Sequence, residues 1–262
     1  MPEGDSVYRV AARLREVLEG KTLTRSQLRV ADLAEVDLAG EVVGGVVPAG
    51  KHLFIRVGDW SLHSHMRMEG TWHVYPRGAR WRRPGFQARV VLETDTHQVV
   101  GFNVAEVALF PTREERSITD RLGPDPLTPG WGAGGEEEAA ARVSADTRPI
   151  HVALLDQWNV AGFGNEYANE ICFLGGVDPA TPANEVDAAH LVNIGARLIR
   201  ANRNRVPRTT TGNTRKGQRL HVYGRAGRPC FRCGTTVRFT RLGATEGTGR
   251  HVYWCPHCQP SR

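Results

Sequence analysis

Two pairs of cysteines near the end of the chain have the spacing of a metal site. Cys230 and Cys233 form one C-x2-C pair, and Cys255 and Cys258 form a second after 21 intervening residues. Two such pairs can enclose a tetrahedral Zn²⁺ ion. Because all four ligands are thiolates, no coordination position is left for water, so the sequence predicts one structural zinc. With four sulfurs available, we expect His257 to be a bystander.

The start of the chain, MPEGDS, offers a second kind of chemistry. Proline is a small second residue, so we expect removal of Met1, which leaves Pro2 with a free secondary amine. Such an amine can act as a nucleophile. Taken alone, these residues also fit an ordinary chain start, so other motifs are needed to choose between that interpretation and a nucleophilic Pro2.

Three polar residues lie at turns or at the starts of expected elements. Asn165 follows the turn AGFGN at the start of an expected helix, where free backbone amides favour an anion. Arg250 begins the returning strand of an expected hairpin between the cysteine pairs, and it faces either solvent or a phosphate backbone. Lys51 lies in a turn between two apolar strands, a place where lysine is usually solvated.

The stretch HSHMRMEG contains two methionines that alternate with charged residues. This alternation is typical of a half-buried strand with Met66 and Met68 in the core. One of them can instead serve as a wedge that enters a base stack.

Hydrophobic spacing indicates which elements hold these residues. Apolar residues recur at helical spacing from Val7 to Leu18, which predicts a helix that holds the N-terminus in place. From residue 22 to 110 the pattern changes to short β-type runs broken by Gly, Pro and Asp, as in a sandwich or barrel. A Gly-rich linker, LTPGWGAGG, then leads into helical patterns at about 136–143, 150–158, 165–174 and 185–203.

Composition and charge narrow the class of protein. The 262 residues are 40% hydrophobic, which is ordinary for a globular chain with a sizeable core. We find neither a signal peptide nor the roughly 18 apolar residues of a membrane span, so a cytoplasmic location is expected. The segment from Arg197 to Arg262 holds 15 Lys and Arg residues against the single acid Glu246. An excess of this kind favours a polyanionic partner such as nucleic acid.

Taken in order, five stretches resemble one known family: MPEG, GKHLFI, HMRMEG, DQWNVAGFGNEYANE and VYGRAGRPCFRCG…GRHVYWCPHCQ. Over nearly its whole length the chain is similar to the formamidopyrimidine-DNA glycosylase / endonuclease VIII family of base-excision repair enzymes. An N-terminal Pro-Glu, a helix-two-turn-helix and a terminal four-cysteine finger together are highly specific to that family.

The resemblance implies a bifunctional DNA glycosylase and AP lyase. Pro2 matches the family nucleophile, which attacks C1′ of the damaged nucleotide and forms a Schiff base, from which β- and δ-elimination cut the strand. Glu3 matches the acid that protonates the sugar ring oxygen. Lys51 matches a lysine that contacts the sugar-phosphate and donates protons.

The resemblance also implies how DNA is held. Asn165 and Arg250 match phosphate-binding residues, and Met68 matches the residue that fills the void left by the flipped nucleotide. The expected partner is double-stranded DNA with a damaged base or an abasic site, bound by a nucleoid-associated monomer.

Two departures from the family bear on the substrate. Ser6 stands where many relatives have a glutamate, and the RRFG-type loop of the formamidopyrimidine branch is absent. The corresponding segment, GFNVAEVALF, is closer to the endonuclease VIII branch and favours oxidised pyrimidines. The alternatives are the same chemistry on oxidised purines (8-oxoguanine, formamidopyrimidines) and a non-catalytic damaged-DNA-binding homologue.

We therefore predict an α+β chain of three domains. They are an N-terminal antiparallel β-sandwich with an N-terminal helix (1–130), a helical helix-two-turn-helix domain (131–226) and a β-hairpin zinc finger (227–262).

Overall fold

The computed structural model describes residues 2–243 and 249–261. Its contacts divide the chain into two compact units, Met1–Asp120 and Arg121–Arg262, each described separately below. The first boundary expected from the sequence lies at residue 130, and the division into three domains stays a prediction. No helix among the described residues is both long and apolar enough to cross a membrane.

The first unit begins with helix α1 (Gly4–Leu18), as the apolar spacing predicted. Val7, Ala11, Leu14 and Leu18 form its buried stripe, because residues three and four apart share one face of a helix. After the helix the chain turns at Gly20, whose φ of 72° lies in the left-handed region that glycine favours.

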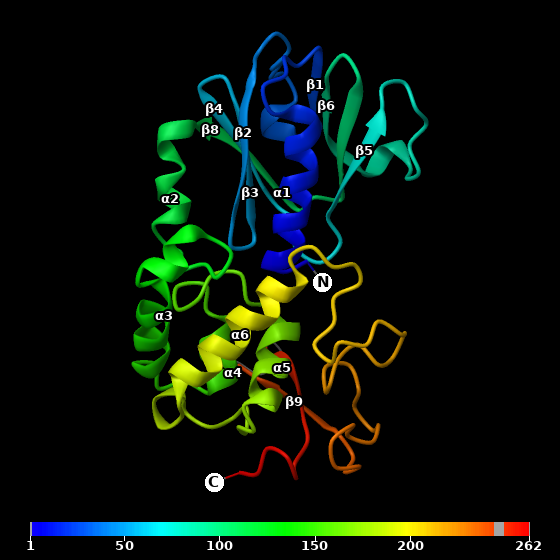
Figure 1. Ribbon diagram of the computed structural model, residues 1–262. Helices are drawn as coiled ribbons and strands as arrows, with labels where there is room; N and C mark the ends of the chain where they lie inside the picture. Colours follow the sequence, from blue (N-terminus) through cyan, green and yellow to red (C-terminus); the bar gives the residue numbers. More distant parts are fainter. Residues whose placement is uncertain (1, 244–248, 262) are drawn as a thin grey trace. The chain divides into compact units, whose positions relative to one another are not determined.

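Two four-stranded antiparallel sheets follow, with the strand orders β1-β6-β7-β5 and β2-β3-β4-β8 (Figure 1). The strands are β1 (Arg25–Leu28), β2 (Val43–Ala49), β3 (His52–Val57), β4 (Trp60–His65), β5 (Thr71–Pro76), β6 (Ala88–Glu93), β7 (His97–Phe102) and β8 (Glu106–Pro111). One hydrophobic core contains side chains from α1 and from both sheets, for example Ile55 of β3 and Leu92 of β6. The predicted sandwich with its N-terminal helix is confirmed. Short helices in its connections are η1 (Ala31–Leu33), η2 (Gly85–Gln87), η3 (Thr112–Glu114) and α2 (Arg116–Thr119).

The second unit is helical up to residue 202. Its helices are η4 (Pro129–Ala133), α3 (Gly135–Ser144), α4 (Ile150–Leu155), α5 (Asn165–Leu174), η5 (Ala183–Glu185) and α6 (Ala188–Asn202). Phe163, Tyr167 and Ile171 lie in their common core. Gly195 of α6 lets this core close, because a Cβ at that position would lie 2.4 Å from Cζ of Phe163. The turn between α4 and α5 contains Gly162, whose φ is 93°.

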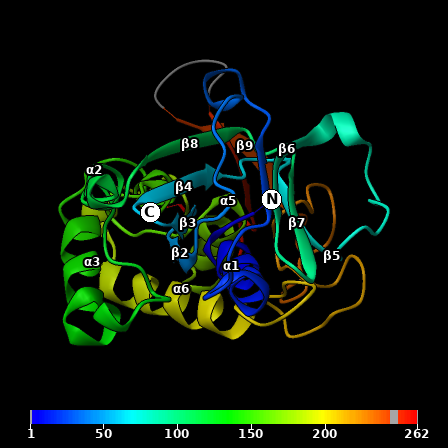
Figure 2. The ribbon, with the colours of Figure 1, turned by 90° about the horizontal axis from the view of Figure 1, so that it is seen from above.

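Near the end of the chain, β9 (Arg238–Leu242), labelled in Figure 2, pairs antiparallel with β10 (Arg250–Trp254). A small core joins the hairpin region to the helices and contains Phe173 of α5 together with Val222, Val237 and Cys255. The predicted helical domain and C-terminal finger hairpin are thus both present.

Candidate active site and metal centre

The N-terminus is held by the first turn of α1. Glu3 is fully buried and extended, and its carbonyl oxygen accepts hydrogen bonds from the amides of Ser6 (2.8 Å) and Val7 (3.1 Å). Pro2, directly before it, is half-buried, and Met1 lies outside the described residues. The residue with the candidate amine is therefore attached to a rigid helix end.

Ser6 makes a local structural contact. Its hydroxyl accepts a hydrogen bond from Arg9 (3.1 Å), which also pairs with the buried carboxylate of Asp5 (3.1 Å). These contacts stiffen the first turn of α1.

Lys51 lies in the tight turn between β2 and β3, as the sequence predicted. Gly50 before it has a φ of 56°, and the pairing of Ala49 with His52 closes the turn. The turn thus presents a half-buried lysine from a short, well-paired hairpin.

Three histidines lie next to this turn, and the sequence reasoning missed them. His52 Nδ1 lies 2.9 Å from His63 Nε2, and the rings of His52 and His65 lie 5.0 Å apart. Burial, and to a lesser extent the neighbouring histidines, lowers the pKa of His52 and His63 to about 4, so both are neutral at pH 7. The alternation of His63 and His65 indicates that these two side chains share one face of a strand. His52 joins them only because it pairs with His65 in the register of β3 and β4.

The two methionines have different environments. Met66 is buried in the core, whereas the side chain of Met68 is 64% exposed. Arg67 between them has a φ of 53°, and this left-handed residue turns the chain so that the strand alternation stops. Gly70 completes the turn, since a Cβ there would lie 2.4 Å from the Met66 carbonyl oxygen. The expectation of two core methionines is thus wrong for Met68, which is available as a wedge.

In the second unit, Asn165 and Arg250 lie on neighbouring elements. Asn165 is the first residue of α5, and its Nδ2 donates to the carbonyl oxygen of His251 at 3.0 Å. Arg250 is the first residue of β10, is exposed, and makes no ion pair in the part of the chain that the structure describes. The structure therefore holds an unneutralised arginine beside the start of α5, where helix amides favour an anion.

Glu170 of α5 is a second residue that the sequence reasoning missed. Its buried carboxylate accepts hydrogen bonds from the amides of His221 (2.7 Å), Val222 (2.9 Å) and Tyr223 (2.9 Å), and from the hydroxyl of Thr210. One carboxylate thus joins both ends of the basic segment 210–223.

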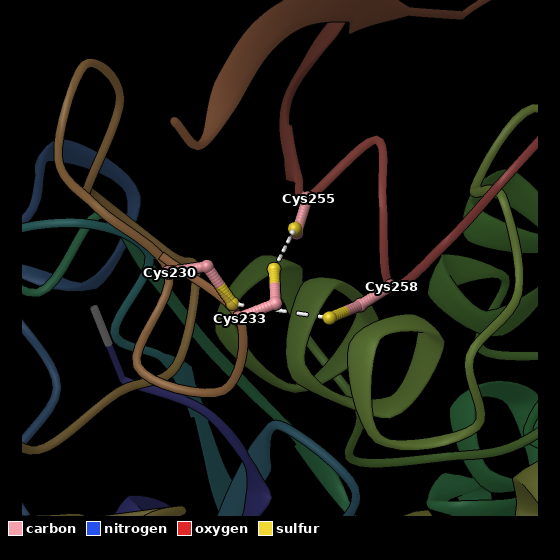
Figure 3. Close-up of side chains that lie close together, drawn as sticks. All are labelled: Cys230, Cys233, Cys255 and Cys258. Carbon is pink, nitrogen blue, oxygen red and sulfur yellow. Dashed lines mark hydrogen bonds between the residues drawn. The ribbon is translucent and has the colours of Figure 1, made fainter. Parts of the chain in front are cut away.

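The four cysteines converge as predicted (Figure 3). Their sulfur atoms all lie within 4.8 Å of one another; Cys233 and Cys255 are 3.4 Å apart, and Cys230 and Cys258 are 4.0 Å apart. These spacings are too long for disulfides and fit tetrahedral sulfurs around Zn²⁺ at about 2.3 Å. Hydrogen bonding with Thr235 lowers the pKa of Cys233 to about 6, whereas burial raises the pKa of Cys255 and that of Cys258, so the convergence of the four sulfurs is what points to a metal.

The comparisons with known proteins agree with this geometry. The formamidopyrimidine-DNA glycosylase N-terminal domain matches residues 1–105, and the formamidopyrimidine-DNA glycosylase H2TH domain matches residues 122–212. Probable endonuclease 8 2 of Streptomyces coelicolor is 47% identical over 99% of this chain and 94% of its own length. DNA-(apurinic or apyrimidinic site) lyase Nei2 of Mycolicibacterium smegmatis is 44% identical over 99% of both chains.

Among solved structures, Lactococcus lactis Fpg in complex with abasic-site DNA superimposes with a TM-score of 0.80 at 24% identity. The match covers 99% of this chain and 100% of that chain, and it shows the shared fold. The match to both domain models and the 44–47% identities to full-length relatives lead to one conclusion. The chain belongs to the formamidopyrimidine-DNA glycosylase / endonuclease VIII family, on its endonuclease VIII branch.

Proposed function

We propose that this protein is a bifunctional DNA glycosylase and AP lyase of base-excision repair that removes oxidised pyrimidines from duplex DNA. The observation that carries the proposal is the placement of Pro2 and the buried Glu3 at the start of α1, in a chain of this family. A nucleophile attached to a rigid helix loses little freedom when it attacks.

In the proposed reaction, the Pro2 nitrogen bonds to C1′ of the damaged nucleotide as the bond from C1′ to the base breaks and the base leaves with a proton. Glu3 donates a proton to the sugar ring oxygen, and ring opening leaves an iminium between Pro2 and C1′. Loss of a 2′ proton then expels the 3′ phosphate, and a second elimination expels the 5′ phosphate. Lys51 contacts the sugar-phosphate and donates protons.

Three residues make the DNA contacts in this proposal. Asn165 and Arg250 bind phosphates beside the lesion, supported by their placement at the starts of α5 and β10. The exposed Met68 fills the void left by the flipped nucleotide.

We also propose that the cysteine cluster holds one structural Zn²⁺ ion. Bound there, the ion would cross-link the two cysteine loops and so fix the strands between them. Val237 and Cys255 pack with Phe173 of α5, so the folded loops would hold β10 against the helices.

The preference for pyrimidines is supported by the turn between β7 and β8. Three residues, 103–105, separate these strands, and none is Arg or Phe. Phe102, at the end of β7, is fully buried. A turn this short carries no Arg-Phe pair that can probe the base opposite an oxidised purine.

Excision by the purified protein from a panel of defined duplexes tests the proposed function. We expect release of 5-hydroxyuracil and thymine glycol with strand cleavage, and much slower release of 8-oxoguanine opposite cytosine. Faster release of 8-oxoguanine would shift the substrate to oxidised purines. Binding of every duplex without any cleavage would mean that the chain is a non-catalytic homologue.

A further inference from the structure

Strand β5 (Thr71–Pro76) forms one open edge of its sheet, because β7 is its only neighbour in the sheet among the described residues. The Arg77 amide donates to the Thr96 carbonyl oxygen (2.9 Å). This bond shows which residues of β5 direct their backbone groups toward β7: Arg77 and every second residue before it. Backbone groups alternate sides along an antiparallel strand, so the amides and carbonyls of Trp72 and Val74 face the open edge. Such an edge is a template for another strand.

A groove of about 240 Å³ lies beside this strand. It is lined by Arg13 of α1, by β5 residues Trp72 to Tyr75 and by Arg82 of the loop that follows β5. The groove thus combines strand backbone and two flanking cations.

The loop that carries Arg82 is fixed in place. The hydroxyl of Tyr75 lies 3.2 Å from His73 Nδ1 and accepts a hydrogen bond from the Arg82 amide (3.3 Å). Farther along the loop, Arg29 donates to the Gly85 carbonyl oxygen (3.1 Å). A ligand would therefore have to restrict few further motions of this loop, which lowers the entropic cost of binding.

The cations around the groove are not neutralised by the protein. Arg13, Arg82 and Arg83 all lower the pKa of His73, after the larger effect of burial, so all three lie close to it. None of the three forms a salt bridge in the described part of the chain, whereas Arg9 and Arg15 of the same helix α1 each pair with an acid. Because these arginines have no acidic partner within the described residues, the groove favours an anionic ligand.

We propose that this groove binds an extended acidic peptide segment of a partner protein, which adds a strand to β5 while its carboxylates pair with Arg13 and Arg82. A peptide has both amides and carbonyls to match those of Trp72 and Val74, whereas the phosphates of a nucleic acid only accept hydrogen bonds.

The test uses fluorescence anisotropy of the full-length protein with a labelled Glu-Val-Asp-Asp-Val-Glu peptide at physiological salt. We expect saturable binding that Arg13→Ala with Arg82→Ala weakens about tenfold or more, since each charge-assisted pair is a strong contact. Arg80→Ala is the matched control, because it removes the same charge from the same loop but does not line the groove. It should change affinity less than twofold.

Two further probes separate strand addition from simple charge attraction. The same peptide with alternate backbone amides methylated keeps its charge but cannot pair with β5, and we expect its binding to be lost. Equal binding of the methylated peptide, or no effect of the double substitution, would overturn the proposal. So would a loss of duplex DNA binding in the double variant as large as its loss of peptide binding, because the groove would then be a nucleic-acid contact.

Discussion

The side-chain oxygen of Asn169 accepts a hydrogen bond from the backbone amide of Tyr253 at 2.5 Å, which ties helix α5 to strand β10. The Nδ2 of Asn169 donates to the His251 carbonyl oxygen (3.2 Å) and to the Asn165 carbonyl oxygen (2.7 Å). This buried carboxamide thus bonds to one backbone N–H and one backbone carbonyl of β10, as the backbone of a neighbouring strand would. It therefore sets the place of Arg250, one residue before His251, relative to Asn165.

The first prediction is that Asn169→Ala lowers affinity for abasic-site DNA about as much as Arg250→Ala does. Loss of buried hydrogen bonds costs about 1–3 kcal/mol and frees β10 from α5. The double variant should bind no more weakly than either single one, because both remove the same contact. Titrations of labelled DNA measure all three affinities.

Asn159→Ala is the control for this cycle. Asn159 is also buried and bonds to Asp146 and to the Ala153 carbonyl oxygen, so its loss should cost similar stability without touching β10. Additive losses of affinity for Asn169→Ala and Arg250→Ala would contradict the coupling.

The second prediction concerns the metal. Cys230→Ser should remove bound zinc and weaken DNA binding, because a thiolate ligand is lost and the two cysteine loops are no longer joined. His257→Ala should keep one zinc per chain, since His257 is exposed and outside the cluster. Metal analysis beside DNA titration gives both readouts; full DNA affinity in metal-free protein would argue against a structural ion.

The third prediction is a pH dependence that arises from the histidine cluster. The pKa of His52 and of His63 is about 4 in the folded protein, below the ordinary value of 6.5. The unfolded chain then binds more protons between these values, so the free energy of unfolding is highest above about pH 6.5 and falls as the pH drops toward 4. One such histidine contributes a slope of at most about 1.4 kcal/mol per pH unit.

Urea unfolding at pH 7.5 and pH 5 measures this loss. His63→Gln should reduce the difference between the two pH values, because one titrating group is gone. His190→Gln is the control, since His190 is exposed in α6 and should leave the difference unchanged. A stability that does not vary between these pH values would refute the neutral cluster.

The fourth prediction is that Glu170→Gln loosens the basic segment 210–223. An amide group in place of one carboxylate oxygen would meet backbone donors, and a buried donor without an acceptor costs about 1–3 kcal/mol. Trypsin should then cut faster at Arg215, Lys216 and Arg219. Glu138→Gln, which alters an exposed acid paired with Arg142, should leave the cleavage rate as in the wild type.

Much of the fold could be predicted from local patterns. The apolar spacing of α1 and the alternation of the strands depend on residues close in the sequence, and the C-x2-C spacing fixes two ligands within one loop. The environment of Met68 could not be predicted, because it depends on the left-handed backbone of Arg67. The roles of His52 and Glu170 depend on strand register and on contacts about 50 residues away, which no local pattern contains.

The most direct test of the account is to trap the reaction on damaged duplex DNA with borohydride and to locate the attached nucleotide by mass spectrometry of protease fragments. Reduction converts the Schiff base into a stable bond. We predict an adduct on the peptide that begins with Pro2, in protein that has lost Met1. An adduct on a lysine side chain such as Lys51, or full activity in protein that retains Met1, would contradict the assignment of Pro2 as nucleophile.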